Sequence, residues 1–103
     1  LLSLRQRPDA VFCYNDVLAY GAFKAIFEAR LRVPEDVGVI GVANMASFSF
    51  WDASPVALTT IDQNVPQLAD AISDLVLALV ARKHRGPSKH ILLQPKLVIR
   101  GST

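Results

Sequence analysis

The sequence predicts an α/β fold with a parallel sheet flanked by helices, and three segments carry this prediction. Residues 10–14 and 37–42 are short apolar stretches with the length of buried strands, and between them apolar residues recur at helical spacing from Val17 to Arg30. A strand, a helix and a strand in this order favour a right-handed parallel crossover. With 103 residues, the chain is at most one small domain.

The ends of these elements bring polar residues to one edge of the predicted sheet. Asn15 and Asp16 stand just before the helix and are residue types favoured at an N-cap. Pro34 interrupts the helical pattern before the second strand. Ligands of open parallel sheets bind beyond the carboxyl ends of the strands. Asn15, Asp16 and Asn44 all follow predicted strands, so we expect a small molecule to bind there.

A second helix is predicted over about residues 65–82, because this segment has a strongly apolar face. The face consists of Leu68, Ala71, Ile72, Leu75, Val76, Leu79 and Val80. An apolar face of this size that nothing covers marks an interface or a risk of aggregation.

Composition excludes several classes of function. Hydrophobic residues make up 51% of the chain, and the net charge of +2 is too small to indicate a nucleic-acid surface. The basic run at residues 82–85 is interpreted as a solvated helix end. The single cysteine allows no internal disulfide, which suits a reducing cytoplasm. The apolar residues 75–81 are too few to cross a bilayer, and the start without Met suggests a piece of a longer chain.

Five ordered pieces of the chain carry a resemblance to a known family. They are Asn15-Asp16, the Ala19-x-Gly21 helix start, residues 31–41 (LRVPEDVGVIG), residues 55–63 (PVALTTIDQ) and the ending 97–103 (LVIRGST). In this order and spacing the sequence resembles the LacI/GalR family of bacterial transcription regulators.

The resemblance implies a part of a two-lobed, periplasmic-binding-protein-like type I fold. Residues 7–58 and 89–103, with a last strand near residues 91–99, would then belong to the C-terminal lobe, and the helix within residues 62–84 to the N-terminal lobe. The stretch 59–63 marks a crossing between lobes. The chain holds no helix-turn-helix, so the DNA-binding domain is absent from it. We expect the isolated fragment to self-associate or to repack its apolar helix.

The resemblance also points to ligand-binding residues at Asn15, Asp16, Asn44 and Trp51. For Asn15, a ligand contact and a plain N-cap remain equally open, whereas capping is favoured for Asp16. Sugar-responsive members place an Asp where this chain has Ala43. Three alternatives follow: Asn44 replaces the carboxylate contact with a weaker amide contact, the effector is not an ordinary hexose, or the pocket binds nothing. Trp51 suits a packing or dimer contact better than a ligand contact.

The first helix corresponds by resemblance to a dimer contact. Tyr20, Phe23, Lys24 and Phe27 are the predicted interface residues, with aromatic character common at interfaces. Packing of Phe23 and Phe27 against the sheet is an equally ordinary alternative.

An enzyme is not expected, because no nucleophile, base or metal constellation can be assembled. Cys13 lies in a predicted buried strand, and His84 and His90 have no partner at ligand spacing. The sequence therefore predicts no cofactor and no metal. It predicts a cytoplasmic effector-binding and dimerisation domain that takes a sugar or related metabolite, forms a homodimer, meets DNA only through the missing domain and does not touch a membrane. The alternatives are an exported periplasmic sugar-binding protein and a degenerate dimerisation module without effector.

Overall fold

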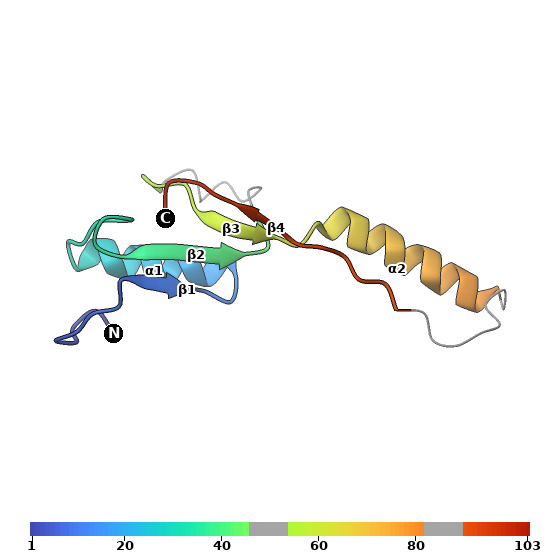
Figure 1. Cartoon of the computed structure of the whole chain (residues 1–103), viewed down its shortest axis with the longest axis horizontal. Coiled ribbons are helices and arrows are strands. Elements are labelled where there is room, and N and C mark those ends of the chain that lie inside the picture. Colours follow the sequence, from blue (N-terminus) through green and yellow to red (C-terminus); the bar gives the residue numbers. More distant parts are fainter. Residues whose placement is uncertain (46–53, 82–89) are drawn as a thin grey trace.

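The computed structural model describes residues 1–45, 54–81 and 90–103, which form four strands and two helices (Figure 1). In chain order the elements are β1 (Ala10–Phe12), α1 (Asp16–Glu28), β2 (Gly38–Val42), β3 (Thr59–Asp62), α2 (Val65–Val80) and β4 (Lys96–Val98). The predicted strands near residues 10–14 and 37–42 and both predicted helices are confirmed, with ends shifted by one to two residues.

The four strands form one sheet in the order β1-β2-β3-β4. The pairs β1–β2 and β2–β3 are parallel, and β3–β4 is antiparallel. The predicted parallel sheet is therefore confirmed for three strands, while β4 makes the whole sheet mixed. β3 lies inside the sheet, a position that the resemblance, which marks residues 59–63 only as a crossing between lobes, does not predict, and Thr59 and Thr60 are fully buried there.

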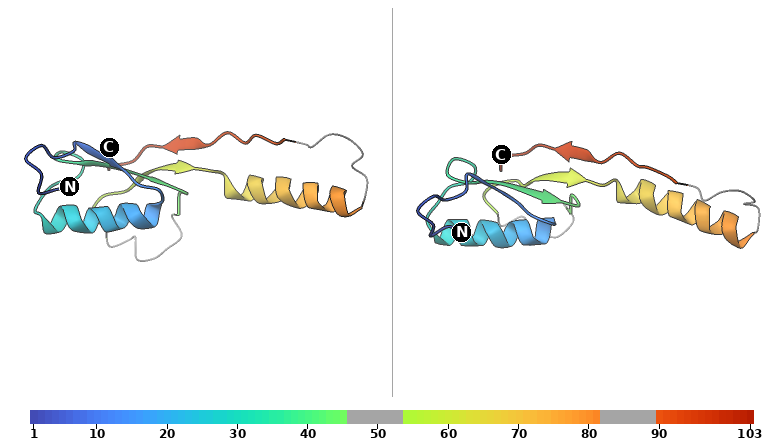
Figure 2. Two further views of the ribbon diagram at one scale, coloured as in Figure 1. Left: turned by 90° about the horizontal axis from the view of Figure 1, so that it is seen from below. Right: turned by 60° about the horizontal axis from the view of Figure 1, so that its bottom comes forward.

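The core lies between the sheet and α1, which runs along one sheet face (Figure 2). Phe23 and Ile26 of α1 pack with Val37, Val39 and other buried side chains, each 7% exposed or less. Full burial of such a side chain stabilises a fold by about 1.5–3 kcal/mol. The core is therefore built mostly by the contiguous β1-α1-β2 unit, which fixes the edge where the polar residues gather.

Local hydrogen bonds define both ends of α1. The side chain of Asn15 accepts from the backbone N–H of Leu18 at 2.9 Å, which is an N-cap. At the other end the N–H groups of Arg30 and Leu31 donate to the carbonyls of Phe27 and Ile26, with Arg30 left-handed at φ 57°. This is the Schellman arrangement, which stops the helix before the turn into β2.

The C-terminal residues hold the middle of the sheet together. Ser102 is fully buried, and its hydroxyl donates to the carbonyl of Val39 at 2.6 Å. The same hydroxyl accepts from the backbone N–H of Thr59 at 2.8 Å. One side chain thus joins β2 to β3 after the chain has travelled out along α2 and returned.

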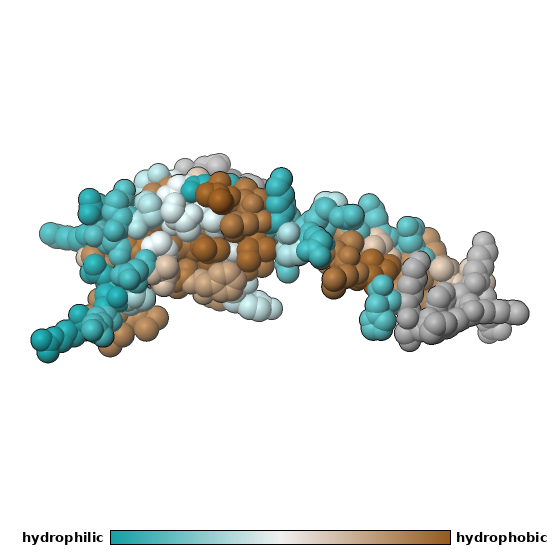
Figure 3. Space-filling view, in the orientation of Figure 1, coloured by the Kyte–Doolittle hydropathy of each residue, from teal (hydrophilic) through white to brown (hydrophobic). Residues whose placement is uncertain are grey.

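The second helix projects away from the sheet, as Figures 1 and 2 show. The chain measures 59 × 30 × 18 Å with a radius of gyration of 18.7 Å, whereas a compact domain of this length has about 13 Å. No residue of α2 is buried, and Ile72 and Val80 are 53% and 76% exposed. The predicted apolar face is therefore present and lies off the sheet (Figure 3).

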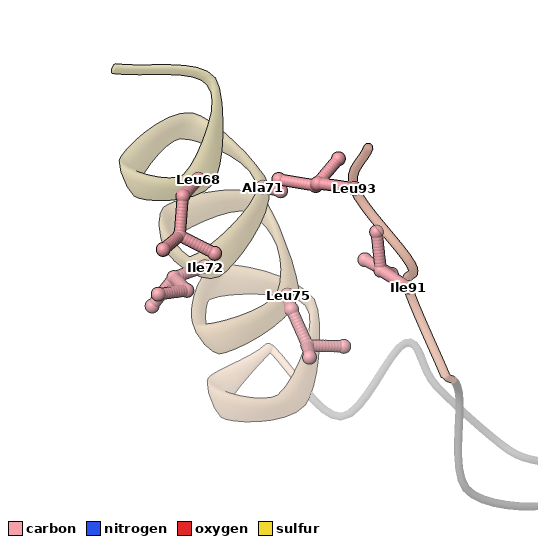
Figure 4. Close-up of a pocket in the computed structure, with 6 residues that line it drawn as sticks. All are labelled: Leu68, Ala71, Ile72, Leu75, Ile91 and Leu93. Atoms are coloured by element: carbon pink, nitrogen blue, oxygen red, sulfur yellow. The ribbon is translucent and has the colours of Figure 1, made fainter. Parts of the chain in front are cut away.

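The segment before β4 runs beside α2 and gives its apolar face limited cover. Figure 4 shows Ile91 and Leu93 beside the helix, with Leu93 and Ala71 pointing toward one another. The two segments line an open pocket of about 160 Å³. Within the described parts of the chain, neither helix has the length and hydrophobicity needed to cross a bilayer.

Candidate functional site

A pocket of about 280 Å³ opens at the carboxyl ends of β1 and β2, where the sequence predicts a binding site. Its lining residues are Phe12, Tyr14, Asn15, Val42, Ala43 and Gln63. Sites for small molecules enclose about 300–1,000 Å³ and surround most of the ligand. The pocket falls just below this range, which suits one wall of a site that closes from the opposite side.

Among the described residues, the side chains that line the pocket are aromatic, apolar or carboxamide, and none is a carboxylate or a cation. Phe12 and Tyr14 are 65% and 82% exposed at its rim. Aromatic faces pack against flat or ring-shaped ligands, and carboxamides both donate and accept hydrogen bonds. The lining is therefore suited to an uncharged ring with polar substituents.

Asn15 combines the two roles that its sequence position left open. Its Oδ1 caps α1 through the N–H of Leu18, while the residue also lines the pocket. Among the described residues, none accepts a hydrogen bond from its Nδ2. The N-cap is confirmed, and it leaves the two donors of the amide directed to a ligand or to water.

Asp16 has a structural role that the sequence does not predict. It is 3% exposed and does not line the pocket. Its Oδ1 accepts from the hydroxyl of Thr60 at 2.6 Å, and its Oδ2 accepts from the N–H of Met45 at 2.7 Å. The carboxylate therefore joins the start of α1 to β3 and to the turn after β2. The helix is capped by Asn15, so the interpretation of Asp16 as the cap is wrong, while its ligand contact stays a prediction.

The side chain of Asn44 also makes hydrogen bonds within the protein, and its ligand contact stays a prediction. Its Nδ2 donates to Oδ2 of Asp62 at 3.0 Å, and its Oδ1 accepts from Nη2 of Arg100 at 2.7 Å. It adopts a left-handed backbone at φ 49°, which Asn tolerates better than most residues. Asn44 therefore shapes the turn behind the pocket, and it is Ala43, at φ 103°, that faces the pocket.

Two further charged residues complete this polar cluster and were not singled out by the sequence. Arg100 also donates through Nη1 to the carbonyl of Leu58 at 2.7 Å. Asp62 accepts through Oδ1 from the N–H of Asn64 at 2.7 Å. Hydrogen bonds from Asn64 and Asn44, with the nearby charges of Lys96 and Arg100, lower the pKa of Asp62. Asp62 ends β3 at this edge of the sheet, so the strand-end rule finds it. Arg100 follows β4, which is antiparallel, and therefore lies beside the start of β3; it reaches Asn44 only through its side chain.

The predicted interface residues on α1 divide into two groups. Phe23 is 2% exposed and packs in the core, so this part of the prediction is wrong and the alternative of packing against the sheet holds. Its ring lies edge-on to Tyr20 at 5.3 Å between centroids. Phe27 is half-buried against the core, and Lys24 is exposed beside Glu28. Trp51 lies outside the described residues.

Cys13 is a buried thiol, as predicted, and burial raises its pKa. A thiol in this state is a poor nucleophile. Across residues 1–45, 54–81 and 90–103, no three His, Cys, Asp or Glu side chains gather in a way that would hold a metal ion. The described polar residues at this edge make hydrogen bonds within the protein.

The whole chain, residues 1–103, matches the sequence model of the periplasmic binding protein-like domain. The chain belongs to this family. Within it, the chain is similar to the transcriptional repressor PurR of Mannheimia succiniciproducens, with 44% identity over 102 residues. PurR of Klebsiella pneumoniae is 41% identical over the same length. The predicted resemblance to LacI/GalR-type regulators is thus confirmed.

Solved structures support the same assignment. A protein from Actinobacillus succinogenes superposes with a TM-score of 0.86 at 34% identity, covering all of this chain and 37% of that one. A LacI family transcriptional regulator from Lactobacillus casei with bound sucrose gives 0.74 at 31% identity, covering 94% of this chain and 34% of that one. The chain spans 29% of the length of the two curated relatives while 99% of it is matched.

Proposed function

We propose that this chain is the C-terminal part of the effector-binding and dimerisation domain of a LacI/GalR-type transcription regulator. A small molecule bound in the pocket at the ends of β1 and β2 would change the DNA affinity of a helix-turn-helix domain elsewhere in the protein. The observation that carries the proposal is the one-sided pocket, with the free donors of Asn15 at its wall, in a chain of this family. In this role the protein acts in the cytoplasm and is not an enzyme.

The effector proposed is an uncharged, sugar-like molecule. The Lactobacillus casei regulator has been solved with sucrose and with glucose, and a relative from Arthrobacter sp. FB24 with lactose. The lining of aromatic and carboxamide side chains supports a neutral ligand, while Ala43 supplies no acceptor. A hydrogen bond from a sugar hydroxyl to a carboxylate contributes about 1.5–3 kcal/mol. Because Ala43 provides no such carboxylate, we expect a simple hexose to bind weakly.

The division into lobes is also part of the proposal. Residues 7–58 and 89–103 form the C-terminal lobe, and the helix within 62–84 belongs to the N-terminal lobe. Support comes from α2, which has no buried residue and stands clear of the sheet. A homodimer is proposed through the outer side of α1, now carried by Tyr20, Lys24 and Phe27. Phe23 takes no part because it is buried in the core.

A thermal-shift screen of the full-length protein against neutral sugars, sugar phosphates, nucleosides and uronic acids tests the effector role. A ligand that binds only the folded state raises its Tm. The informative variant is Asn15→Asp, because Asp caps a helix as well as Asn does but lacks the two Nδ2 donors. We expect the ligand-free Tm to stay close to wild type and the ligand-induced shift to be lost.

Two outcomes would count against the proposal. A hit whose shift survives in Asn15→Asp would place the ligand elsewhere. The absence of any hit would favour the degenerate dimerisation module, which the missing acceptor at Ala43 already allows. In that case Ala43→Asp would be the first change to test for gain of sugar binding.

A further inference from the structure

Two walls of the pocket are tied together by a single carboxylate. Ala43 lines the pocket from the turn after β2, and Gln63 lines it from the segment that leads into α2. The residue after Ala43 is Asn44 and the residue after Gln63 is Asn64. Asp62 accepts hydrogen bonds from both of these asparagines, through Oδ2 at 3.0 Å and Oδ1 at 2.7 Å.

The carboxylate stands where the chain leaves the sheet. Asp62 is the last residue of β3, and α2 begins at Val65 after the left-handed Asn64, whose φ is 50°. Since no residue of α2 is buried, packing on the sheet does not set the direction of the helix. The sheet therefore acts on the direction of the helix through the two segments that leave it, namely the crossing at residues 62–64 and the stretch before β4 that runs beside α2.

We propose that the Asp62 carboxylate is a positioning group that sets the orientation of α2 against the pocket-bearing edge of the sheet. Its link to effector control rests on the function proposed above. A molecule bound between Ala43 and Gln63 contacts both segments that the carboxylate joins. If it binds more tightly at one distance between these two segments, it also favours one orientation of α2. A ligand shifts such an equilibrium only by its difference in affinity for the two states.

The chemistry of the pair allows a sharp test. In Asp62→Asn, the amide has one acceptor oxygen, so whichever way it turns, one of the two donors loses its partner. Asn44 cannot compensate by turning its own amide, because its Oδ1 is held by Arg100 at 2.7 Å. The exchanged pair Asn44→Asp/Asp62→Asn restores every bond: the introduced carboxylate accepts from Arg100 and from the introduced amide, whose oxygen accepts from the N–H of Asn64.

The measurement is the distance distribution between spin labels on α1 and α2 in the ligand-free, full-length protein. Labels are placed by Ala25→Cys and Ser73→Cys, both exposed positions, and labelled protein is diluted with unlabelled protein so that only distances within one chain are observed. We expect Asp62→Asn to broaden the distribution at least about twofold and the exchanged pair to return it to the wild-type width. Asp70→Asn, which removes the same charge from an exposed position on α2, should leave it unchanged.

An unchanged width in Asp62→Asn would overturn the proposal, as would an exchanged pair as broad as the single variant. If Asp62→Asn does not fold, Asn44→Asp alone serves instead, because it sets two carboxylates against each other and should broaden the distribution as much. No ligand enters the measurement, so its result is independent of the effector screen.

Discussion

Replacement of Gly41 by Ala should destabilise the protein through Asp16. Gly41 lies in β2 under the first turn of α1, where a Cβ would collide with Oδ1 of Asp16 and approach Cδ2 of Leu58 at 3.0 Å and Cα of Asp16 at 3.2 Å. The carboxylate must move, and it then loses the geometry of its bonds to Thr60 and to the N–H of Met45.

The size of the effect follows from these contacts. Overpacking a buried site costs about 1–3 kcal/mol, and each hydrogen bond to a charged group contributes about 1.5–3 kcal/mol. The lower backbone entropy of Ala in the unfolded chain offsets about 0.4–1 kcal/mol. If the carboxylate keeps one of its two bonds, the free energy of unfolding falls by about 3 kcal/mol.

A double-mutant cycle with Asp16→Ala separates this mechanism from simple crowding. Urea denaturation of the wild type, the two single variants and the double variant gives the four free energies of unfolding. With the carboxylate removed, Gly41→Ala meets only Leu58 and the Asp16 backbone, and its cost should fall to about 1 kcal/mol. Additive costs, with a coupling energy near zero, would refute the argument that the Asp16 carboxylate transmits the damage.

Three further predictions concern stability. Arg30→Gly should raise the free energy of unfolding by about 0.5–1 kcal/mol, seen as a higher Tm, because the left-handed C′ position at φ 57° suits Gly; a lower Tm would contradict it. Ser102→Ala should lower the free energy of unfolding, measured by urea denaturation, by about 2 kcal/mol, because two buried backbone groups lose their hydrogen-bond partner. A loss below about 0.5 kcal/mol would show that water takes the place of the hydroxyl. The pKa of Asp62 is lowered in the folded state, so its contribution to stability is complete above the unfolded pKa and is lost as the pH falls through the folded pKa. The advantage of wild type over Asp62→Asn in urea should therefore hold near neutral pH and shrink on acidification below the unfolded pKa, and a constant difference would argue against it.

The elements that the sequence predicts well are those whose apolar pattern matches their burial. The repeat over α1 and the continuous apolar run of β2 led directly to the β1-α1-β2 unit, because both are packed in the core. The apolar pattern does not predict β3, because its buried residues are Thr59 and Thr60. Their hydroxyls make hydrogen bonds to residues that are distant in the sequence. A polar pair of this kind resembles a loop until those partners are known.

The strand-end rule leads to the edge of the sheet where the pocket opens, but only part of the pocket's lining follows from the sequence. Asn15 lines the pocket, whereas Asp16 and Asn44 point into the protein and bond to residues far along the chain. Phe12 and Tyr14 looked like core residues because they continue an apolar stretch, yet β1 is an edge strand and exposes them. Sequence spacing gives the edge of the sheet but not the direction of each side chain.

The projection of α2 gives the chain an uneven resistance to unfolding. Residues 10–42 close their core through neighbours in the sequence, so this unit folds without waiting for distant segments. A helix of 16 residues with no buried side chain is only marginally stable in water. Amide hydrogens of α2 should therefore exchange by local opening long before those of β2, and whatever packs on this helix also completes its folding.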